Sequence, residues 1–139
     1  NNVVVIDGVA LVGINGWQLT TITTHNFLDD FHIKCYKFED ITYLDKTIEK
    51  LQLHNDVKKI LVVSSCIPLR ELYFKEVETQ YDEVYPGQIL YRDTEHKIIK
   101  WLYGSNERIV DTTINGINYV NNAKFDKEPY YAKRVEVTI

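Results

Sequence analysis

The segment NVVVIDGVALVGI holds two runs rich in β-branched residues, separated by a single Asp-Gly pair. Residues 3–6 and residues 9–14 are each long enough to form a strand. Both central positions of a two-residue hairpin turn need a positive φ, which Asp7 and Gly8 adopt at low cost. A β-hairpin that turns at Asp7-Gly8 is therefore predicted.

Further strands are predicted along the chain. RIVDTTINGINYVNN alternates on both arms of Asn115-Gly116, which predicts a second hairpin. Residues 60–63 form an unbroken apolar run, which is typical of a strand buried on both faces. A buried strand is also expected near residues 100–103. The alternating tail KRVEVTI is expected to form a final, half-exposed strand.

Helices are predicted between these strands. Residues 18–40 show no regular pattern, but Asp40 is suited to cap a helix that follows it. The apolar residues at helical spacing in that helix are Ile41, Leu44, Ile48 and Leu51. A helical turn is expected after Pro68, and a short helix capped by Asp93 is expected before the strand near residue 100.

Composition bounds the class of protein. At 139 residues the chain is expected to form a single domain over residues 1–139, and 45% hydrophobic with 26% charged residues is an ordinary globular mixture. The net charge of -4 argues against a nucleic-acid binder, which usually carries a basic face. No run approaches the roughly 18 apolar residues of a membrane span, and no signal peptide is recognised. We therefore expect a cytoplasmic protein that does not contact membranes.

Cysteine and histidine spacing predicts neither a disulfide framework nor a metal site. Cys35 and Cys66 lack a CxxC partner and are expected to be buried free thiols. The four histidines have no His-x-His or His-x3-His pair, so surface positions are favoured over a zinc site. They are His25, His32, His54 and His96. The densest group of alternative ligands is His25, Asp29, Asp30 and His32.

The order of these elements resembles the C-terminal half of the calcineurin-like metallophosphoesterases. The stretches that carry the resemblance are VGINGW, VVSSCIP, WLYGSNE, the Asn-Gly hairpin and EPYYAKRVEVTI. In that family one strand ends in Val-Val-Ser-His, and a later one ends in Gly-His-x-His before an Asn-Gly hairpin. The resemblance covers about residues 2–139. It implies a truncated α/β domain, with α+β as the alternative, built on a β-sandwich-like core flanked by helices.

The same resemblance bears on catalysis. Family members clamp phosphate between two cations about 3.5–4 Å apart. Gly104 matches the glycine of the later motif, whereas Ser65, Ser105 and Glu107 stand where the three histidine ligands would be. A serine hydroxyl is a poor transition-metal ligand, and the Asp-x-His and Gly-Asn-His motifs of the N-terminal half are absent. The resemblance therefore implies a protein that is not an enzyme and needs no cofactor.

We expect a catalytically inactive, phosphoesterase-derived module that binds protein, in the setting of a viral accessory or host-directed protein in the host cytoplasm. The alternatives are one half of a split phosphodiesterase or nuclease, completed by a separate N-terminal half, and a virion or assembly component. Tyrosine anchors interfaces efficiently. The candidate contact residues are Tyr73, Phe74, Tyr81, Tyr85, Tyr130 and Tyr131.

Self-association is also expected, because in the family the N-terminal half supplies strands that complete the sheets. An open apolar edge would otherwise template aggregation, and two-fold dimers are the commonest soluble oligomers. The competing expectation is that residues 18–40 cover the sheet instead.

Overall fold

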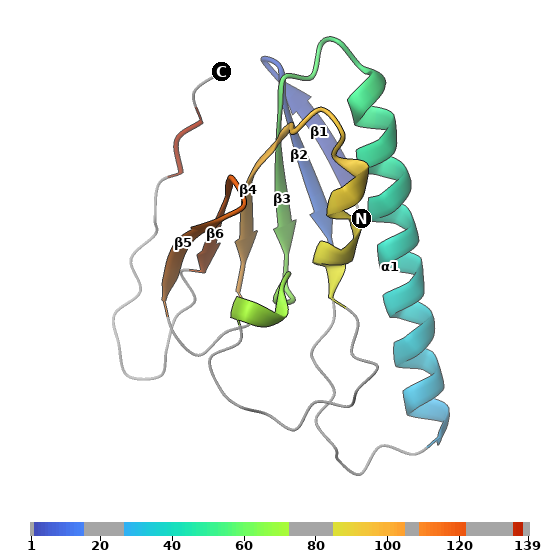
Figure 1. Cartoon of the computed structure of the whole chain (residues 1–139). Coiled ribbons are helices and arrows are strands. Elements are labelled where there is room, and N and C mark those ends of the chain that lie inside the picture. Colours follow the sequence, from blue (N-terminus) through green and yellow to red (C-terminus); the bar gives the residue numbers. More distant parts are fainter. Residues whose placement is uncertain (1, 16–26, 73–84, 105–108, 122–134, 138–139) are drawn as a thin grey trace.

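The computed structural model describes residues 2–15, 27–72, 85–104, 109–121 and 135–137, with the backbone alone for residues 27–37 (Figure 1). These residues build one six-stranded sheet in the order β1-β2-β3-β4-β6-β5. The strands are β1 (Asn2–Ile6), β2 (Val9–Ile14), β3 (Lys59–Ser64), β4 (Ile98–Tyr103), β5 (Val110–Ile114) and β6 (Ile117–Asn121).

The sheet is mixed. The four inner strands β2, β3, β4 and β6 are parallel to one another, and the outer strands β1 and β5 pair antiparallel with β2 and β6. β3 therefore has a parallel neighbour on both sides. Its central residues are largely buried, as the unbroken apolar run predicted.

Both predicted hairpins are confirmed. β1 and β2 turn at Asp7 and Gly8, with φ values of 49° and 82°, and β5 and β6 turn at Asn115 and Gly116, with φ values of 50° and 83°. Positive φ at both central positions twists the turn in the sense that matches two right-twisted strands. Local turn chemistry thus fixes both edges of the sheet.

The long helix α1 (Phe27–Leu53) joins β2 to β3. It begins at Phe27, so the predicted start at Asp40 is wrong, and Asp40 is buried inside the helix with 6% of its surface exposed. Leu44, Ile48 and Leu51 are buried, which confirms the predicted apolar side. Residues 27–40 are thus helical, and no strand of residues 18–40 covers a sheet edge within the part of the chain described.

Two 3-10 helices lie between β3 and β4. η1 (Arg70–Leu72) confirms the helical turn expected after Pro68, and η2 (Pro86–Arg92) packs beside α1 (Figure 1). The prediction of a helix that starts at Asp93 is wrong, because Asp93 lies at the end of η2. Its carboxylate accepts hydrogen bonds from the backbone N–H groups of Lys97 (2.9 Å) and Ile98 (3.0 Å) and so shapes the turn into β4.

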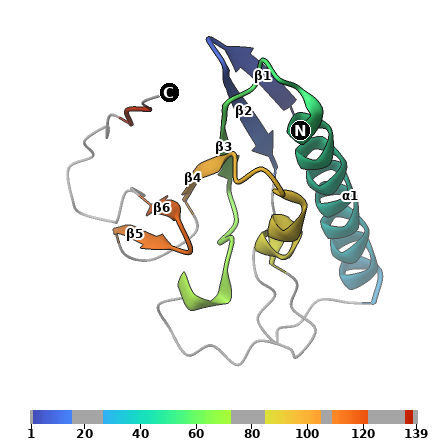
Figure 2. The same cartoon turned by 45° about the horizontal axis from the view of Figure 1, so that its top comes forward.

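The core lies between one face of the sheet and the two helices. α1 and η2 sit on the same side of the strands (Figures 1 and 2). Their buried residues pack with Ala10, Val12, Val62, Trp101 and Tyr119. The α/β class is confirmed, but the sandwich-like core is wrong. The parallel strands are covered by helices, and the described residues form a single sheet rather than two packed ones.

On the opposite face of the sheet, one row of side chains changes character from β1 to β6. The register aligns Val4, Leu11 and Leu61 with Lys100 and Asn118, and cross-strand partners share a face. The row is apolar over β1 to β3 and polar over β4 and β6, where the Lys100 ammonium donates to Asn118 Oδ1 at 2.7 Å. This row is therefore apolar on the side of β1.

Two smaller findings complete the fold. Residues 135–137 are not in a strand, so the strand predicted for the tail is wrong over these residues. The other residues of KRVEVTI lie outside the described part of the chain. Within the described residues, no helix is both long and apolar enough to cross a membrane.

Candidate site at the carboxyl ends of the parallel strands

The carboxyl ends of β2, β3, β4 and β6 meet at one end of the sheet, toward the bottom of Figure 1. Sites of open α/β sheets usually lie at this end, because loops leaving several strands converge there. The described residues that end or follow these strands are Asn15, Ser64, Ser65, Gly104 and Asn121. They include the strand ends that the sequence singled out.

Ser64 is buried and fixes the end of β3 to β4. Its hydroxyl donates to the carbonyl oxygen of Cys66 at 2.7 Å and accepts the indole N–H of Trp101 at 2.9 Å. The Trp101 ring stacks on Tyr119 of β6, with ring centroids 6.4 Å apart and planes inclined by 24°. A chain of contacts thus crosses β3, β4 and β6 beneath the strand ends.

Ser65 is the exposed residue at the position that the resemblance assigns to a histidine ligand. Its hydroxyl donates to the backbone carbonyl oxygen of Asn15, just beyond the end of β2. The side chain therefore ties together the ends of two neighbouring parallel strands.

The other two predicted ligand positions come shortly after Gly104 in the sequence. Gly104 follows β4, is exposed, and has open space where a Cβ would stand. Ser105 and Glu107 lie outside the described residues. Among the residues that are described, no group of three or more His, Cys, Asp or Glu side chains is placed to hold a metal ion.

The remaining predicted residues are spread through the fold. Tyr85 is half-buried and precedes η2, where its carbonyl oxygen accepts the N–H of Gln88 at 3.1 Å. The other contact candidates, Tyr73, Phe74, Tyr81, Tyr130 and Tyr131, lie outside the described residues, as do His25, Ser105 and Glu107.

The thiols and histidines do not form a cluster in the described structure. Cys66 is buried, as expected, and is a free cysteine, while Cys35 and His32 belong to the part of α1 described by its backbone alone. His54 follows the end of α1 and His96 sits in the turn before β4, and both are exposed, as predicted for surface histidines.

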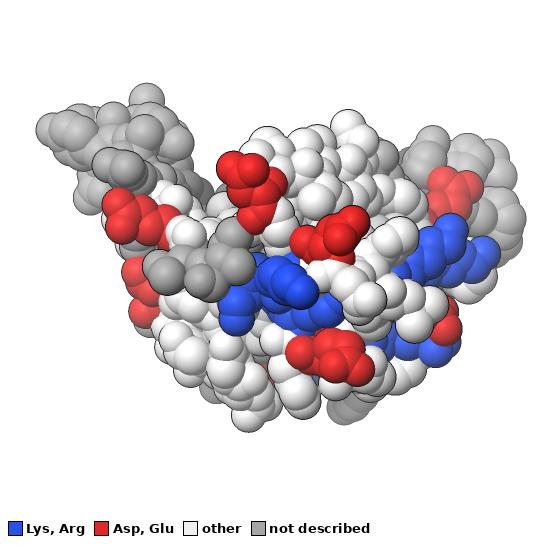
Figure 3. Space-filling view, turned by 90° about the horizontal axis from the view of Figure 1, so that it is seen from above, with Lys and Arg blue, Asp and Glu red and all other residues white. Residues whose placement is uncertain are grey.

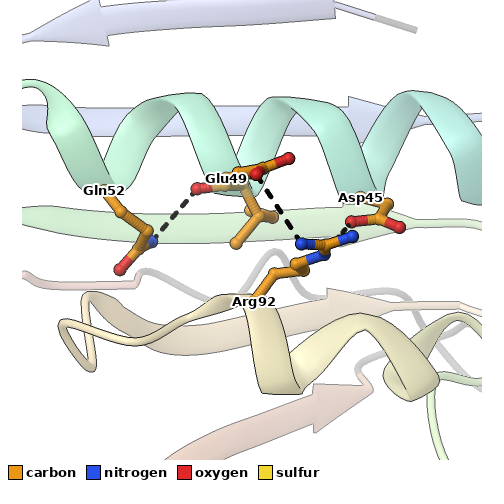
Figure 4. A network of polar contacts seen from close by, with 5 residues as sticks. Asp45, Glu49, Gln52 and Arg92 are labelled. Atoms are coloured by element: carbon orange, nitrogen blue, oxygen red, sulfur yellow. Dashed lines mark hydrogen bonds and ion pairs between the residues drawn. The ribbon is translucent and has the colours of Figure 1, made fainter.

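Sequence reasoning missed a polar network that joins α1 to η2. Arg92 Nε lies 2.6 Å from Asp45 Oδ1, and its Nη1 lies 3.6 Å from Glu49 Oε1 (Figure 4). The side-chain amide of Gln52 donates to Asp93 Oδ1 at 3.0 Å. The spacing of Asp45, Glu49 and Gln52 along one helix face was the available signal, but nothing local indicates Arg92 as the partner.

Burial perturbs one titratable group near the strand ends. Desolvation raises the pKa of the Tyr119 hydroxyl to about 12, and the negative charge of Glu71 contributes in the same direction. The phenol is therefore neutral at physiological pH, and Tyr119 serves as a packed ring rather than as a base.

The surface at the other end of the sheet carries charges of both signs. Viewed from above, lysine and arginine side chains lie among acidic ones rather than forming a continuous basic patch (Figure 3). A nucleic-acid backbone is usually met by a basic patch or stripe, and the described residues of this face do not form one.

Compared with protein-family models, with curated proteins and with solved structures, the chain shows no match.

Proposed function

We propose that this chain is a catalytically inactive protein-binding module on a metallophosphoesterase-like scaffold. The observation that carries the proposal is the hydrogen bond from the Ser65 hydroxyl to the Asn15 carbonyl. At the strand end where the resemblance expects a metal ligand, the side chain stabilises the junction of β2 and β3. A hydroxyl in this role is a poor ligand for Mn, Zn or Fe.

The neighbouring residue supports the same proposal. Ser64 is buried, and its hydroxyl binds the Cys66 carbonyl and the Trp101 indole. Both serines of the VVSS stretch therefore stabilise the sheet. A scaffold kept for binding needs its strand ends fixed in this way, and it has no need for side chains that point toward a substrate.

Protein contact is favoured by the apolar surface around β1. Among the described residues, large apolar side chains are exposed on β1 and on the adjacent β2, and others are exposed elsewhere, at Phe38, Leu53, Tyr91 and Ile109. Contiguous exposed apolar patches usually mark interaction sites.

A second candidate is the split enzyme, in which a separate chain supplies the N-terminal half. The observation that favours it is the apolar row of Val4, Leu11 and Leu61 on the face opposite α1, because such a row is suited to pack against another layer. The completing chain would have to carry Asp-x-His and Gly-Asn-His motifs.

Metal analysis and a phosphodiesterase assay test the catalytic part of the proposal. We expect purified protein to hold no stoichiometric Mn, Zn or Fe, and we expect no metal-dependent hydrolysis of bis(4-nitrophenyl) phosphate in excess Mn. The Glu107→Gln variant controls for contaminating activity, since any trace hydrolysis should then be unchanged. Two metals per chain, with turnover that Glu107→Gln abolishes, would show that the chain is an enzyme.

A further inference from the structure

We propose that β1 pairs edge to edge and antiparallel with β1 of a second copy of this chain, so that the two six-stranded sheets become continuous. The inference rests on the protein-binding function proposed above and names its partner and its contact strand. The family resemblance predicted an open sheet edge where strands of the N-terminal half are missing, which left the buried strand at residues 60–63 without neighbours. The structure supplies those neighbours with β2 and β4 and leaves the outer strands β1 and β5 as the edges.

The two edges of the described sheet differ in their protection against pairing. β5 (VDTTI) exposes Asp111, Thr112 and Thr113, and the Asp111 carboxylate is already hydrogen-bonded by the Asn118 amide at 2.9 Å. β1 (NVVVI) has no charged residue, no proline and no glycine. Natural sheets block unwanted pairing with charge, proline or bulges, so β1 is the less protected edge, although the Val3 N–H already donates to Asn2 Oδ1 at 2.9 Å.

Exposure marks the same strand. Val4, Val5 and Ile6 expose 45%, 49% and 65% of their surface, and Leu11, beside Val4 on β2, exposes 44%. Val4 and Leu11 are direct cross-strand partners, so they form a contiguous apolar strip on the face opposite α1. The strip ends at the free edge of β1.

Charge and symmetry select a second copy as the occupant. In a two-fold antiparallel pairing each residue meets its own strand read backwards, so a charge at or next to the axis would lie near its like. β1 is neutral throughout and pays no such penalty. Full overlap of Asn2–Ile6 with itself places the two-fold axis at Val4, so Val4 faces Val4 of the second copy and Val3 faces its Val5.

This pairing would also extend the apolar strip. The row Leu11–Val4 of one copy continues into Val4–Leu11 of the other, because directly paired residues project from the same face. Val5 projects from the other face, so the apolar strip of each copy consists of Val4, Leu11 and, along β1, Ile6, and it is small. A standard interface buries about 800 Å² per partner, so the main-chain hydrogen bonds must supply much of the affinity.

A dimer of this size is reversible and concentration-dependent. We expect a dissociation constant on the order of micromolar, in keeping with the small area. Sedimentation equilibrium across the micromolar to submillimolar range should show conversion from monomer to dimer. A monomer throughout that range would overturn the proposal.

A charge at the two-fold axis locates the contact. Val4→Lys places two ammonium groups opposite each other, and we expect it to weaken dimerisation at least tenfold. Thr113→Lys, at an exposed position of the other edge strand, is the matched control and should leave the dimer unchanged. Thermal unfolding of both variants checks that each is folded. A folded Val4→Lys that dimerises like the wild type would sink the proposal, as would loss of the dimer in Thr113→Lys alone.

A cysteine at the same position gives an independent readout. Directly opposed residues of antiparallel strands have Cα atoms about 4.5–5.5 Å apart, within the range that a disulfide spans. Val4→Cys should therefore form a covalent dimer under mild oxidation, whereas Thr113→Cys and the wild type should not. A monomer that holds no metal and hydrolyses nothing would refute β1 self-pairing but leave the proposed lack of catalysis intact. A dimer with metal-dependent hydrolysis would refute the lack of catalysis but leave β1 self-pairing intact.

Discussion

The side-chain ammonium of Lys97 donates a hydrogen bond of 2.8 Å to the carbonyl oxygen of Leu51, in the last turn of α1. It also donates to the carbonyl oxygens of Gln52 (3.1 Å) and His54 (3.0 Å). The last carbonyls of a helix have no partner within it and carry its negative dipole end, so one cation satisfies several of them. The turn before β4 therefore closes the end of a helix that lies far earlier in the chain.

Replacing Lys97 by methionine should destabilise the fold by about 1–3 kcal/mol, because charged hydrogen bonds to the helix end are lost while the apolar stem is kept. Urea unfolding followed by circular dichroism measures the change. Lys58→Met is the matched control, since Lys58 is exposed and should shift the free energy of unfolding by less than about 0.5 kcal/mol. Equal midpoints for the two variants would contradict a capping role for Lys97.

Gly116 should resist substitution because of its backbone conformation. Its φ is +83°, and a Cβ there would meet nothing within 4 Å, so strain alone opposes a side chain. We expect Gly116→Ala to cost about 1–2 kcal/mol in the free energy of unfolding. Gly104→Ala, which also adds a Cβ in open space, should be nearly neutral. Thermal unfolding of the two variants measures the difference. An equal loss of stability in both would contradict the role of the positive φ at Gly116.

The hairpins could be predicted because their signal is local. Asp7-Gly8 and Asn115-Gly116 need positive φ at adjacent residues, and few dipeptides supply it at low cost. The buried strand β3 was equally readable, since an unbroken apolar run fits a strand between two others. Each of these elements is specified by a few consecutive residues.

The elements that were mispredicted depend on distant contacts. Asp93 carries the right side chain to begin a helix, but it ends η2 because its carboxylate is held by Gln52, far along α1, and by the following N–H groups. The start of α1 was missed although Leu28, Phe31, Cys35 and Phe38 recur at spacings of three and four. Charged neighbours interrupt that pattern, so the segment looked irregular.

The candidate site was predictable only in part. The apolar run that precedes Ser64 and Ser65 predicts that these two serines lie at the end of a strand. It does not predict their partners, because Asn15 follows β2 and Trp101 lies on β4. The family resemblance predicted a sandwich-like core. The described core instead lies between one sheet and the helices α1 and η2 on one of its faces.

The hydrogen bond between Trp101 and Ser64 should be measurable by a double-mutant cycle. Ser64→Ala leaves the buried indole N–H without its acceptor, and we expect a loss of about 1–3 kcal/mol. Trp101→Phe should cost more, because it also reduces packing against Tyr119. The two losses should sum to more than the loss in the double variant by about 1 kcal/mol. Strict additivity in urea unfolding would show that the contact contributes nothing.

Restoring histidine at the three degenerate positions should not create an enzyme. Ser65→His removes the hydrogen bond to Asn15, so the triple variant Ser65→His, Ser105→His, Glu107→His should be less stable than the wild type. It should also bind Mn weakly, because a site with half its ligands holds metal poorly. Isothermal titration calorimetry with Mn checks this. Tight binding of two metals would mean that the chain already holds the remaining ligands.

The raised pKa of Tyr119 predicts a loss of stability at alkaline pH. The pKa of the phenol is about 12 in the folded protein because burial disfavours the phenolate, against about 10 in the unfolded chain. Below pH 10 both states are neutral, and the full stability is present. Between about pH 10 and pH 12 the unfolded chain loses this proton first, so the free energy of unfolding falls as pH rises, by about 2 kcal/mol from this group. Urea unfolding at successive pH values should therefore show a steeper alkaline decline in the wild type than in Tyr119→Phe, which keeps the ring but cannot ionise. Parallel declines in the two proteins would show that Tyr119 ionises as readily when folded as when unfolded.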